Sequence, residues 1–268
     1  MRNRWMVLAA LAAGSAAAPL LAQRTADQAR LSLGLAAGAT AGTSLWSISG
    51  QPIFDGASLN DTMLISRRLR GSLAVVFHGT YFPGENWGVT GEAMLLGLGT
   101  EDDCRLTFAS GSSRNSQVCN SIRGHSSPAS AVSLSAGVLY RVWSRHVFSP
   151  YARVNGGLVV SQHSSIQTDG FFQSPSEVEP TRATVFDDPT RARVVPVVGV
   201  GMGFTAAVGH GYQLRWELRD NITGVEKVTG PTSGAPNLEP PHKLSYRHIV
   251  SVTFGFDVVL ERRRGRRY

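Results

Sequence analysis

The chain has 268 residues, of which 42% are hydrophobic and 17% charged, and its formal net charge is +7 at pH 7. This length fits one β-barrel or sandwich domain. Loss of Arg2 and Arg4 with an N-terminal leader would leave a net charge of +5, and residues 261–268 carry +4 of it. The rest of the chain is nearly neutral, which excludes an extended basic surface for nucleic acid.

The first residues have the composition of a secretory signal peptide. Arg2 and Arg4 precede an uncharged apolar run that passes into an Ala-rich segment ending at Ala22. This order predicts export with cleavage after Ala22. The apolar run is shorter than the roughly 20 residues of a membrane-spanning helix, and a spanning segment later in the chain would have to be a strand.

Apolar residues at every second position dominate the chain after the leader, which is the period of a two-faced β-sheet. In residues 73–82, for example, Leu73, Val75 and Phe77 share one face and His78 lies on the other. Eight such segments are predicted as strands: residues 31–40, 73–82, 87–95, 132–142, 151–165, 194–206, 212–218 and 250–258.

Short and long connections alternate strictly between these strands. Tight turns are predicted at residues 83–86, 144–150 and 209–211, and long polar loops at residues 42–61, 100–127, 167–191 and 223–243. Cys104 and Cys119 lie in one long loop. Because an exported protein meets an oxidising compartment, we expect a disulfide that closes this loop, with two free thiols as the alternative.

The polar faces of the strands decide between two classes of barrel. A soluble ligand-carrying barrel needs an apolar interior, whereas a membrane barrel turns its apolar face to lipid and encloses small and charged residues. Here the polar faces carry small residues and a lumen charge cluster of six residues: Glu92, Arg141, Arg153, Arg215, Glu217 and Arg219. The predicted fold class is therefore all-β, a transmembrane antiparallel up-and-down β-barrel of about eight strands.

Aromatic residues gather near the predicted strand ends on the short-turn side, where both termini of the chain are expected. They are Tyr81, Phe82 and Trp87 at the first turn, Tyr140, Trp143, Phe148 and Tyr151 at the second, and Tyr212 and Trp216 at the third. Such residues are typical of the interfacial girdle of a membrane barrel.

With these features the chain resembles the small OmpA/OmpX-type outer-membrane barrels, over residues 31–260 and in architecture rather than by a signature motif. The resemblance implies localisation in the bacterial outer membrane, contact with its lipid and lipopolysaccharide, and insertion by the outer-membrane assembly machinery. The assembly signal in such proteins is an aromatic-rich final strand, which Val252, Phe254 and Phe256 match. The family usually stops at that aromatic, whereas here residues 257–268 follow.

The expected organisation is a signal peptide (residues 1–22), a barrel domain (residues 23–260) and an arginine-rich periplasmic tail (residues 261–268). We expect a monomer that needs no cofactor or metal. Its four extracellular loops would carry a structural or surface-interaction role, because loops vary freely on a rigid scaffold.

The lumen charge cluster predicts an ion-pair plug, since an eight-stranded barrel is narrow enough for side chains to fill. A charged constriction in a small pore is the alternative. Gly199, Gly201 and Gly203 alternate with apolar residues and are expected to keep a lumen-facing strand narrow.

Two weaker groups of residues remain. His163, Ser165 and Glu177 resemble in spacing the base, nucleophile and acid of outer-membrane lipid A deacylases, but Ile166 stands where those enzymes carry an Asn. Chance spacing is the preferred explanation, and no catalytic role is predicted. His242 and His248 lack a third ligand at metal-binding spacing. A lipid-modifying enzyme and a secreted lipocalin-like carrier stay open as alternative functions.

Overall fold

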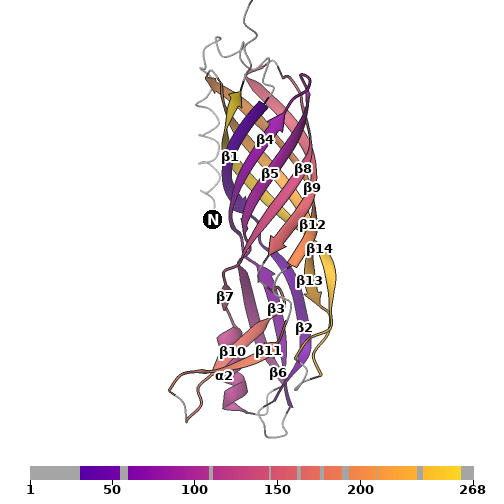
Figure 1. Cartoon of the computed structure of the whole chain (residues 1–268). Coiled ribbons are helices and arrows are strands. Elements are labelled where there is room, and N and C mark those ends of the chain that lie inside the picture. The colour runs from indigo at the N-terminus through magenta and orange to yellow at the C-terminus, as the bar shows by residue number, and fades with distance from the viewer. Residues whose placement is uncertain are drawn as a thin grey trace, which may run out of the picture.

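A computed structural model describes residues 31–54, 60–108, 111–144, 146–161, 164–175, 178–188, 193–209, 211–233 and 238–260. The predicted signal peptide and arginine-rich tail lie outside these residues. The described chain forms a β-barrel with a smaller folded part at one end (Figure 1). None of the described helices has the length and apolar character needed to cross a membrane.

Eight strands close the barrel in the order β1-β14-β13-β12-β9-β8-β5-β4, which confirms the predicted fold class. Every neighbouring pair is antiparallel, and Leu31 opposite Leu260 closes the ring between the first and last strands. The strands are β1 (Leu31–Thr40), β4 (Ser72–Tyr81), β5 (Trp87–Gly97), β8 (Ser130–Arg141), β9 (Phe148–Ser161), β12 (Arg193–Gly209), β13 (Tyr212–Val228) and β14 (His242–Leu260).

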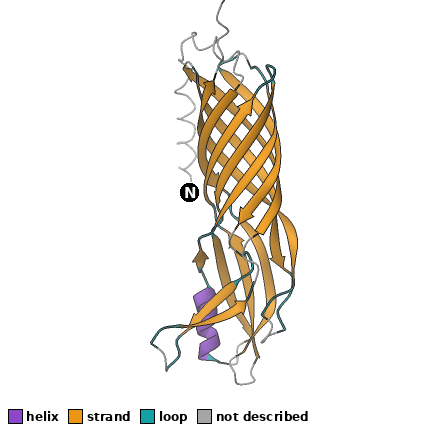
Figure 2. Cartoon of the chain, in the orientation of Figure 1, coloured by secondary structure: helices purple, strands orange, loops and turns teal. Residues whose placement is uncertain are grey.

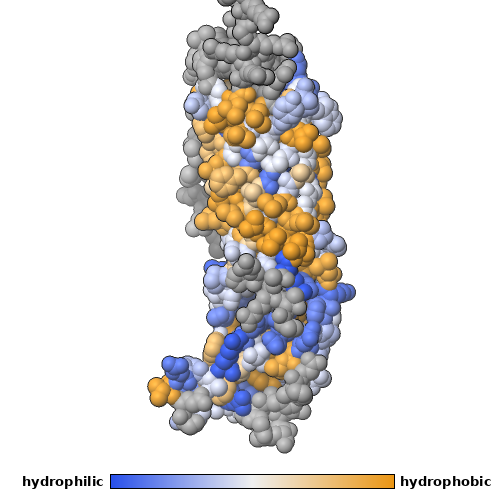
Figure 3. All heavy atoms as spheres, in the orientation of Figure 1, coloured by the Kyte–Doolittle hydropathy of each residue, from blue (hydrophilic) through white to orange (hydrophobic). Residues whose placement is uncertain are grey.

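The apolar faces of these strands point outward. Phe254 on β14 is 52% exposed, whereas Asp257 on the opposite face of the same strand is 0% exposed. In Figure 3 the hydrophobic side chains accordingly spread over the outside of the barrel, and hydrophilic ones gather on the folded part at its end. Because successive side chains alternate between faces, one period-2 pattern produces both the apolar belt and the polar lumen.

The aromatic girdle is present but differs from the prediction at two residues. The ring centroids of Trp87 and Tyr140 lie 4.9 Å apart, and those of Phe148 and Phe204 lie 4.6 Å apart. Phe82 and Tyr151 are instead buried in the lumen, where they cluster with Leu139. Both were assigned to the girdle from their residue type and nearness to a turn, but their strand parity directs them inward.

The segments predicted as long polar loops fold into a structure that we call the cap. It contains a four-stranded sheet in the order β2-β3-β6-β7, the two-stranded sheet β10-β11 and the helix α2 (Figure 2). Their bounds are β2 (Thr43–Phe54), β3 (Asn60–Leu69), β6 (Thr100–Phe108), α2 (Ser113–Ile122), β7 (Ser126–Ser127), β10 (Thr168–Phe172) and β11 (Thr181–Phe186). Strands β13 and β14 also continue past the barrel to the pair Val228–His242.

The sequence predicted long polar loops here and no strands, because the cap strands do not alternate regularly. The register of β2 against β3 shifts between Ser44 and Trp46 and again between Ile48 and Gln51. As a result the adjacent residues Leu45 and Trp46 are both buried. A bulge of this kind breaks the period-2 pattern on which strand prediction depends.

The cap has an apolar core of its own and is tied to the barrel strands. Fifteen buried residues form that core: Leu45, Trp46, Ile48, Met63, Ile65, Leu69, Cys104, Val118, Cys119, Ile122, Ile166, Val185, Phe186, Val228 and Ile249. Arg247 on β14 donates to the Leu45 carbonyl at 2.8 Å. Gln51 donates through its side-chain amide to the Thr232 hydroxyl at 2.7 Å.

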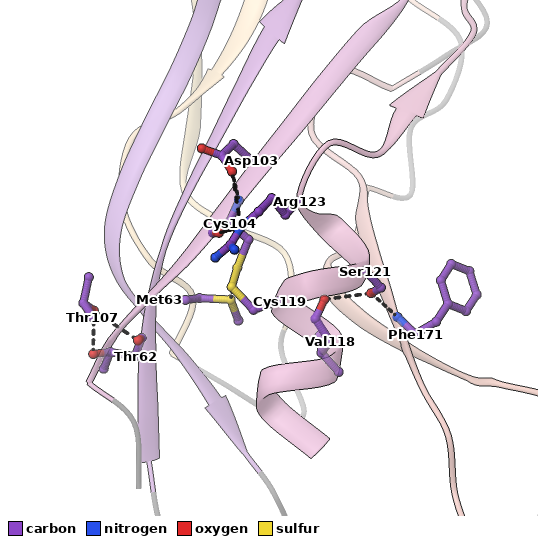
Figure 4. Close-up of a disulfide and its surroundings, with 10 residues drawn as sticks. All are labelled: Thr62, Met63, Asp103, Cys104, Thr107, Val118, Cys119, Ser121, Arg123 and Phe171. Carbon is purple, nitrogen blue, oxygen red and sulfur yellow. Dashed lines mark hydrogen bonds and ion pairs between the residues drawn. A yellow bond between two sulfur atoms is a disulfide. The ribbon is translucent and has the colours of Figure 1, made fainter. Parts of the chain in front are cut away.

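Cys104 and Cys119 form a disulfide, with their Cα atoms 5.3 Å apart. Figure 4 shows that the bond joins strand β6 to helix α2 rather than closing an irregular loop. Ser112 caps the helix by accepting a hydrogen bond from the Asn115 backbone N–H at 3.3 Å. Only Val118, Cys119 and Ile122 supply an apolar face to α2, so its sequence carries little helical periodicity.

Candidate functional site

The lumen holds a network of buried ion pairs centred on Glu217 of β13. Its Oε1 accepts from Arg219 Nη2 at 2.6 Å, and its Oε2 lies 3.4 Å from Arg153 Nη1. The Tyr151 hydroxyl donates to the same Oε2 at 2.7 Å. Arg153 and Arg219 both also bind Glu92, at 2.7 and 2.8 Å. This set joins strands β5, β9 and β13 across the inside of the barrel.

A second set completes the network beside β1. Arg215 donates to Asp257 Oδ2 from Nε at 3.1 Å, and its Nη1 lies 3.6 Å from Glu217. His78 Nε2 lies 2.9 Å from Asp257 Oδ1. Three carboxylates, those of Glu92, Glu217 and Asp257, therefore face three guanidinium groups. Burying ions is costly, and mutual pairing is what makes such a set tolerable.

Glycines make room for these side chains, as the sequence predicted for β12. A Cβ at Gly201 would lie 3.2 Å from Glu217 Oε1, and one at Gly199 would lie 2.4 Å from Asn155 Oδ1. The nearest approach to a side chain of the network is on β1, where a Cβ at Gly34 would overlap Asp257 Oδ1. The His78–Asp257 pair thus crosses the inner face of β1 at a residue without a side chain.

Apolar groups cover the network at both ends. On the short-turn side lie Phe82, Leu139 and Tyr151. On the cap side lies a buried layer of small and aliphatic residues: Ala36, Ala74, Val76, Met94, Leu96, Ala131, Val159 and Val197. The ion-pair network thus lies between two clusters of buried hydrophobic side chains, and buried polar residues such as Ser133, Asn221 and Gln213 lie beside these clusters.

The structure brings together five of the six predicted lumen charges and places Arg141 apart from them. Arg141 lies at the short-turn end, where its Nε donates to the Glu85 carbonyl at 2.6 Å and its guanidinium lies 4.0 Å from the Phe82 ring centroid. Sequence reasoning missed His78 and Asp257 as members. Both sit on the polar face of their strands, which was the available signal.

The weaker candidates do not assemble into a described site. The Ser165 hydroxyl donates to the Glu226 carbonyl at 3.3 Å, while His163 and Glu177 lie outside the described residues. His242 Nε2 is 3.9 Å from Glu226 and His248 Nδ1 is 2.6 Å from Asp220, so each histidine has its own acid. Among the residues that the structure describes, no group of three or more His, Cys, Asp or Glu side chains could hold a metal ion.

No protein-family model matches the chain, and no curated protein does either. Among solved structures, the outer membrane protein OprG from Pseudomonas aeruginosa matches at 12% identity and a TM-score of 0.44, covering 89% of this chain and 99% of that one. Neisserial surface protein A matches at 10% identity and a TM-score of 0.40, covering 86% and 97%. The outer membrane protein AlkL in DMPC lipid bilayers matches at 11% identity and 0.39, covering 88% and 93%.

The geometry of the chain itself defines its architecture. Eight antiparallel strands close on themselves, the outer face is apolar, and the inner face is small, polar and charged. The predominantly apolar interior that a lipocalin-like carrier needs is absent from the described barrel, where the ion-pair network occupies the middle of the lumen. The chain thus has the fold of the small OmpA/OmpX-type outer-membrane barrels.

Proposed function

We propose that this chain is a bacterial outer-membrane barrel with a closed lumen that presents its cap at the cell surface for a structural or surface-interaction role. The observation that carries the proposal is the charge-balanced Glu92–Arg153–Glu217–Arg219 network inside an apolar-faced barrel. Export through the signal peptide at residues 1–22 and insertion by the outer-membrane assembly machinery are part of the proposal.

The orientation follows from the two ends of the barrel. Outer-membrane barrels have short turns on the periplasmic side and longer segments outside the cell. Here β12 and β13 are joined at Gly209–Tyr212 on the short-turn side, whereas the opposite end carries the whole cap. The cap would therefore project past the lipopolysaccharide, and outer-membrane lipid would contact the apolar belt.

Closure of the lumen favours display over conduction. A pore needs a continuous open path, whereas the side chains of the ion-pair network and of the two hydrophobic clusters occupy the inside of this barrel. A folded cap with its own core and disulfide offers a rigid surface for recognition, which an irregular loop does not. The cap surface, and not the lumen, would select the surface partner.

The experiment combines fractionation with conductance. In expressing cells we expect the protein in the outer-membrane fraction, with a gel band that shifts on boiling. In planar bilayers the purified protein should give no single-channel steps. A soluble band of unchanged mobility would refute the membrane assignment, and regular conductance steps would favour the small-pore alternative. A change in lipid A mass that depends on His163 or Ser165 would instead support the lipid-modifying enzyme.

A further inference from the structure

A cavity of about 500 Å³ lies where the barrel meets the cap. Its apolar lining comes from both parts: Leu45 and Leu69 of the cap, and Leu98, Pro128, Ala129, Val159, Val195, Val225 and Ile249 on or next to barrel strands. Sites for small molecules typically enclose about 300–1,000 Å³ and are mostly apolar with a few polar groups. The cavity has the size of such a site, and its lining combines these nine apolar residues with twelve polar or charged ones.

The cavity ends blindly towards the lumen. Val159 lines it and also belongs to the apolar layer above the ion-pair network, together with Val197. Below that layer Glu92, Arg153 and Arg219 fill the barrel. A molecule in the cavity therefore rests on a closed floor, and the arrangement is that of a binding site rather than of a passage.

One side wall of the cavity is a seam between β12 and β13. The pairing of these strands stops at Val197–Thr223, although β12 remains paired with β9 as far as Arg193–Ser161. Thr223 Oγ1 donates to the Pro196 carbonyl at 3.4 Å, so this carbonyl faces β13. Proline has no N–H to donate on the same side, which ends the ladder at this residue.

Above Pro196 an ion pair replaces backbone hydrogen bonds across the seam. Arg193 Nη2 of β12 lies 2.7 Å from Glu226 Oε2 of β13, and both residues line the cavity. Next to the seam on the outer face, Val194 is 61% exposed and Leu158 is 51% exposed. The seam therefore opens beside apolar surface at the upper edge of the belt.

The charges of the lining specify a neutral ligand. Each one is already paired: Arg67 with Asp102, Arg182 with Asp169, and Arg193 with Asp188 and Glu226. An ionised head group would have to break one of these pairs. The hydroxyl groups of Ser164, Ser165 and Thr223 also line the cavity. A hydroxyl can donate to or accept from an oxygen of a bound molecule.

We infer that this cavity binds a small, uncharged, largely apolar molecule with one oxygen function, of the class of a medium-chain alcohol, and that the molecule enters from the membrane through the β12–β13 seam. The apolar lining takes the chain of the ligand, and the lining hydroxyls of Ser164, Ser165 and Thr223 take its oxygen. The site is independent of any partner of the cap surface.

The test uses the full-length protein in lipid vesicles and a ten-carbon alcohol bearing a photoreactive diazirine. After irradiation, mass spectrometry should find label in two lining segments, residues 193–197 and 223–226. Excess 1-decanol should suppress this label, whereas label on the lipid-facing belt should not saturate. Decanoate at pH 8 should compete at least about tenfold less well than 1-decanol, which corresponds to about 1.4 kcal/mol.

Neighbouring residues on β12 provide matched variants. Val195→Trp fills the cavity and should reduce saturable labelling at least about tenfold, whereas Val194→Trp adds the same ring on the lipid face and should leave it unchanged. Glu226→Gln should speed labelling by loosening the seam. A boiling-dependent gel shift verifies that each variant is folded. Label confined to the belt, equal labelling of the two Trp variants, or equal competition by decanoate would overturn the inference.

Discussion

Arg219 and Glu92 meet across the full width of the barrel. Their strands, β13 and β5, are four places apart in either direction around the eight-strand ring, yet Arg219 Nη2 donates to Glu92 Oε2 at 2.8 Å. This bond links opposite walls of the barrel through the lumen. The same contacts stabilise the barrel in a way that lipid-facing residues cannot, because lipid is as apolar as the belt.

Replacement of Glu217 by Gln should destabilise the barrel by about 3–5 kcal/mol, since it leaves three buried arginines with two carboxylates. Urea titration of the folded protein in lipid vesicles, followed by the boiling-dependent gel shift, measures this change. Asp220→Asn is the matched control on the outer face of the same strand. Asp220 pairs with exposed His248, so its loss should cost no more than about 1 kcal/mol. Equal effects of the two variants would contradict the stabilising role of the network.

Gly34→Ala tests whether β1 must lack a side chain beneath the His78–Asp257 pair. The new methyl group would overlap Asp257 Oδ1 and His78 Nε2, so we expect a loss of about 1–3 kcal/mol in the same titration. Gly91→Ala on β5 is the control, because nothing lies within 4 Å of a Cβ there. That variant should be neutral or slightly stabilising. Equal stability of the two variants would show that the pair moves away freely.

The sequence predicted the barrel well because lipid and lumen impose opposite demands on alternate residues. Residues 250–258 show this most clearly, and β14 follows the predicted parity from Val250 to Val258. Five lumen charges could be predicted for the same reason. The ion-pair partners of these charges could not be predicted. Side chains of β13 and β5 meet across the lumen only because the ring of strands closes, and local periodicity does not record that closure.

The girdle prediction was wrong where it relied on residue type, although the alternation of side chains along the strand indicated the correct face. Tyr151 was assigned to the membrane interface as an aromatic near a turn, yet it faces the lumen and donates to Glu217. In the cap, strand and helix signals were too weak: β2 contains two register shifts, and α2 has few apolar residues. Its core forms from segments far apart in the chain, such as Trp46 and Phe186, whose rings lie 5.8 Å apart.

Arg67→Lys should loosen the cap while leaving the barrel intact. Arg67 is 4% exposed, binds both Asp102 oxygens, and donates from Nη2 to the Gln167 carbonyl at 2.7 Å. A single lysine nitrogen cannot make this set of bonds, so we expect a loss of about 1–3 kcal/mol. Hydrogen–deuterium exchange should rise in residues 61–69 and 100–108 and stay unchanged in β13.

The control for this change is Arg68→Lys on the same strand. The Arg68 side chain is 65% exposed, and its hydrogen bond lowers the pKa of Glu101, a carboxyl that is ionised at neutral pH with or without this bond. Replacement of Arg68 should leave the stability essentially unchanged, because an exposed ion pair contributes little. An increase in exchange as large as that of Arg67→Lys would show that buried bidentate pairing does not organise the cap.

Loss of the Cys104–Cys119 disulfide should also act on the cap alone. The bond closes a 15-residue separation and fixes α2 against β6, and a loop of that size is worth about 3 kcal/mol. In the Cys104→Ser/Cys119→Ser variant we expect rapid proteolysis within residues 109–122, while the boiling-dependent shift of the barrel persists. A reducing agent should reproduce this pattern in the unaltered protein and have no effect on the variant. Simultaneous loss of the barrel shift would mean that cap and barrel fold as one cooperative unit, with the shared contacts from Arg247 and Ile249 as the coupling.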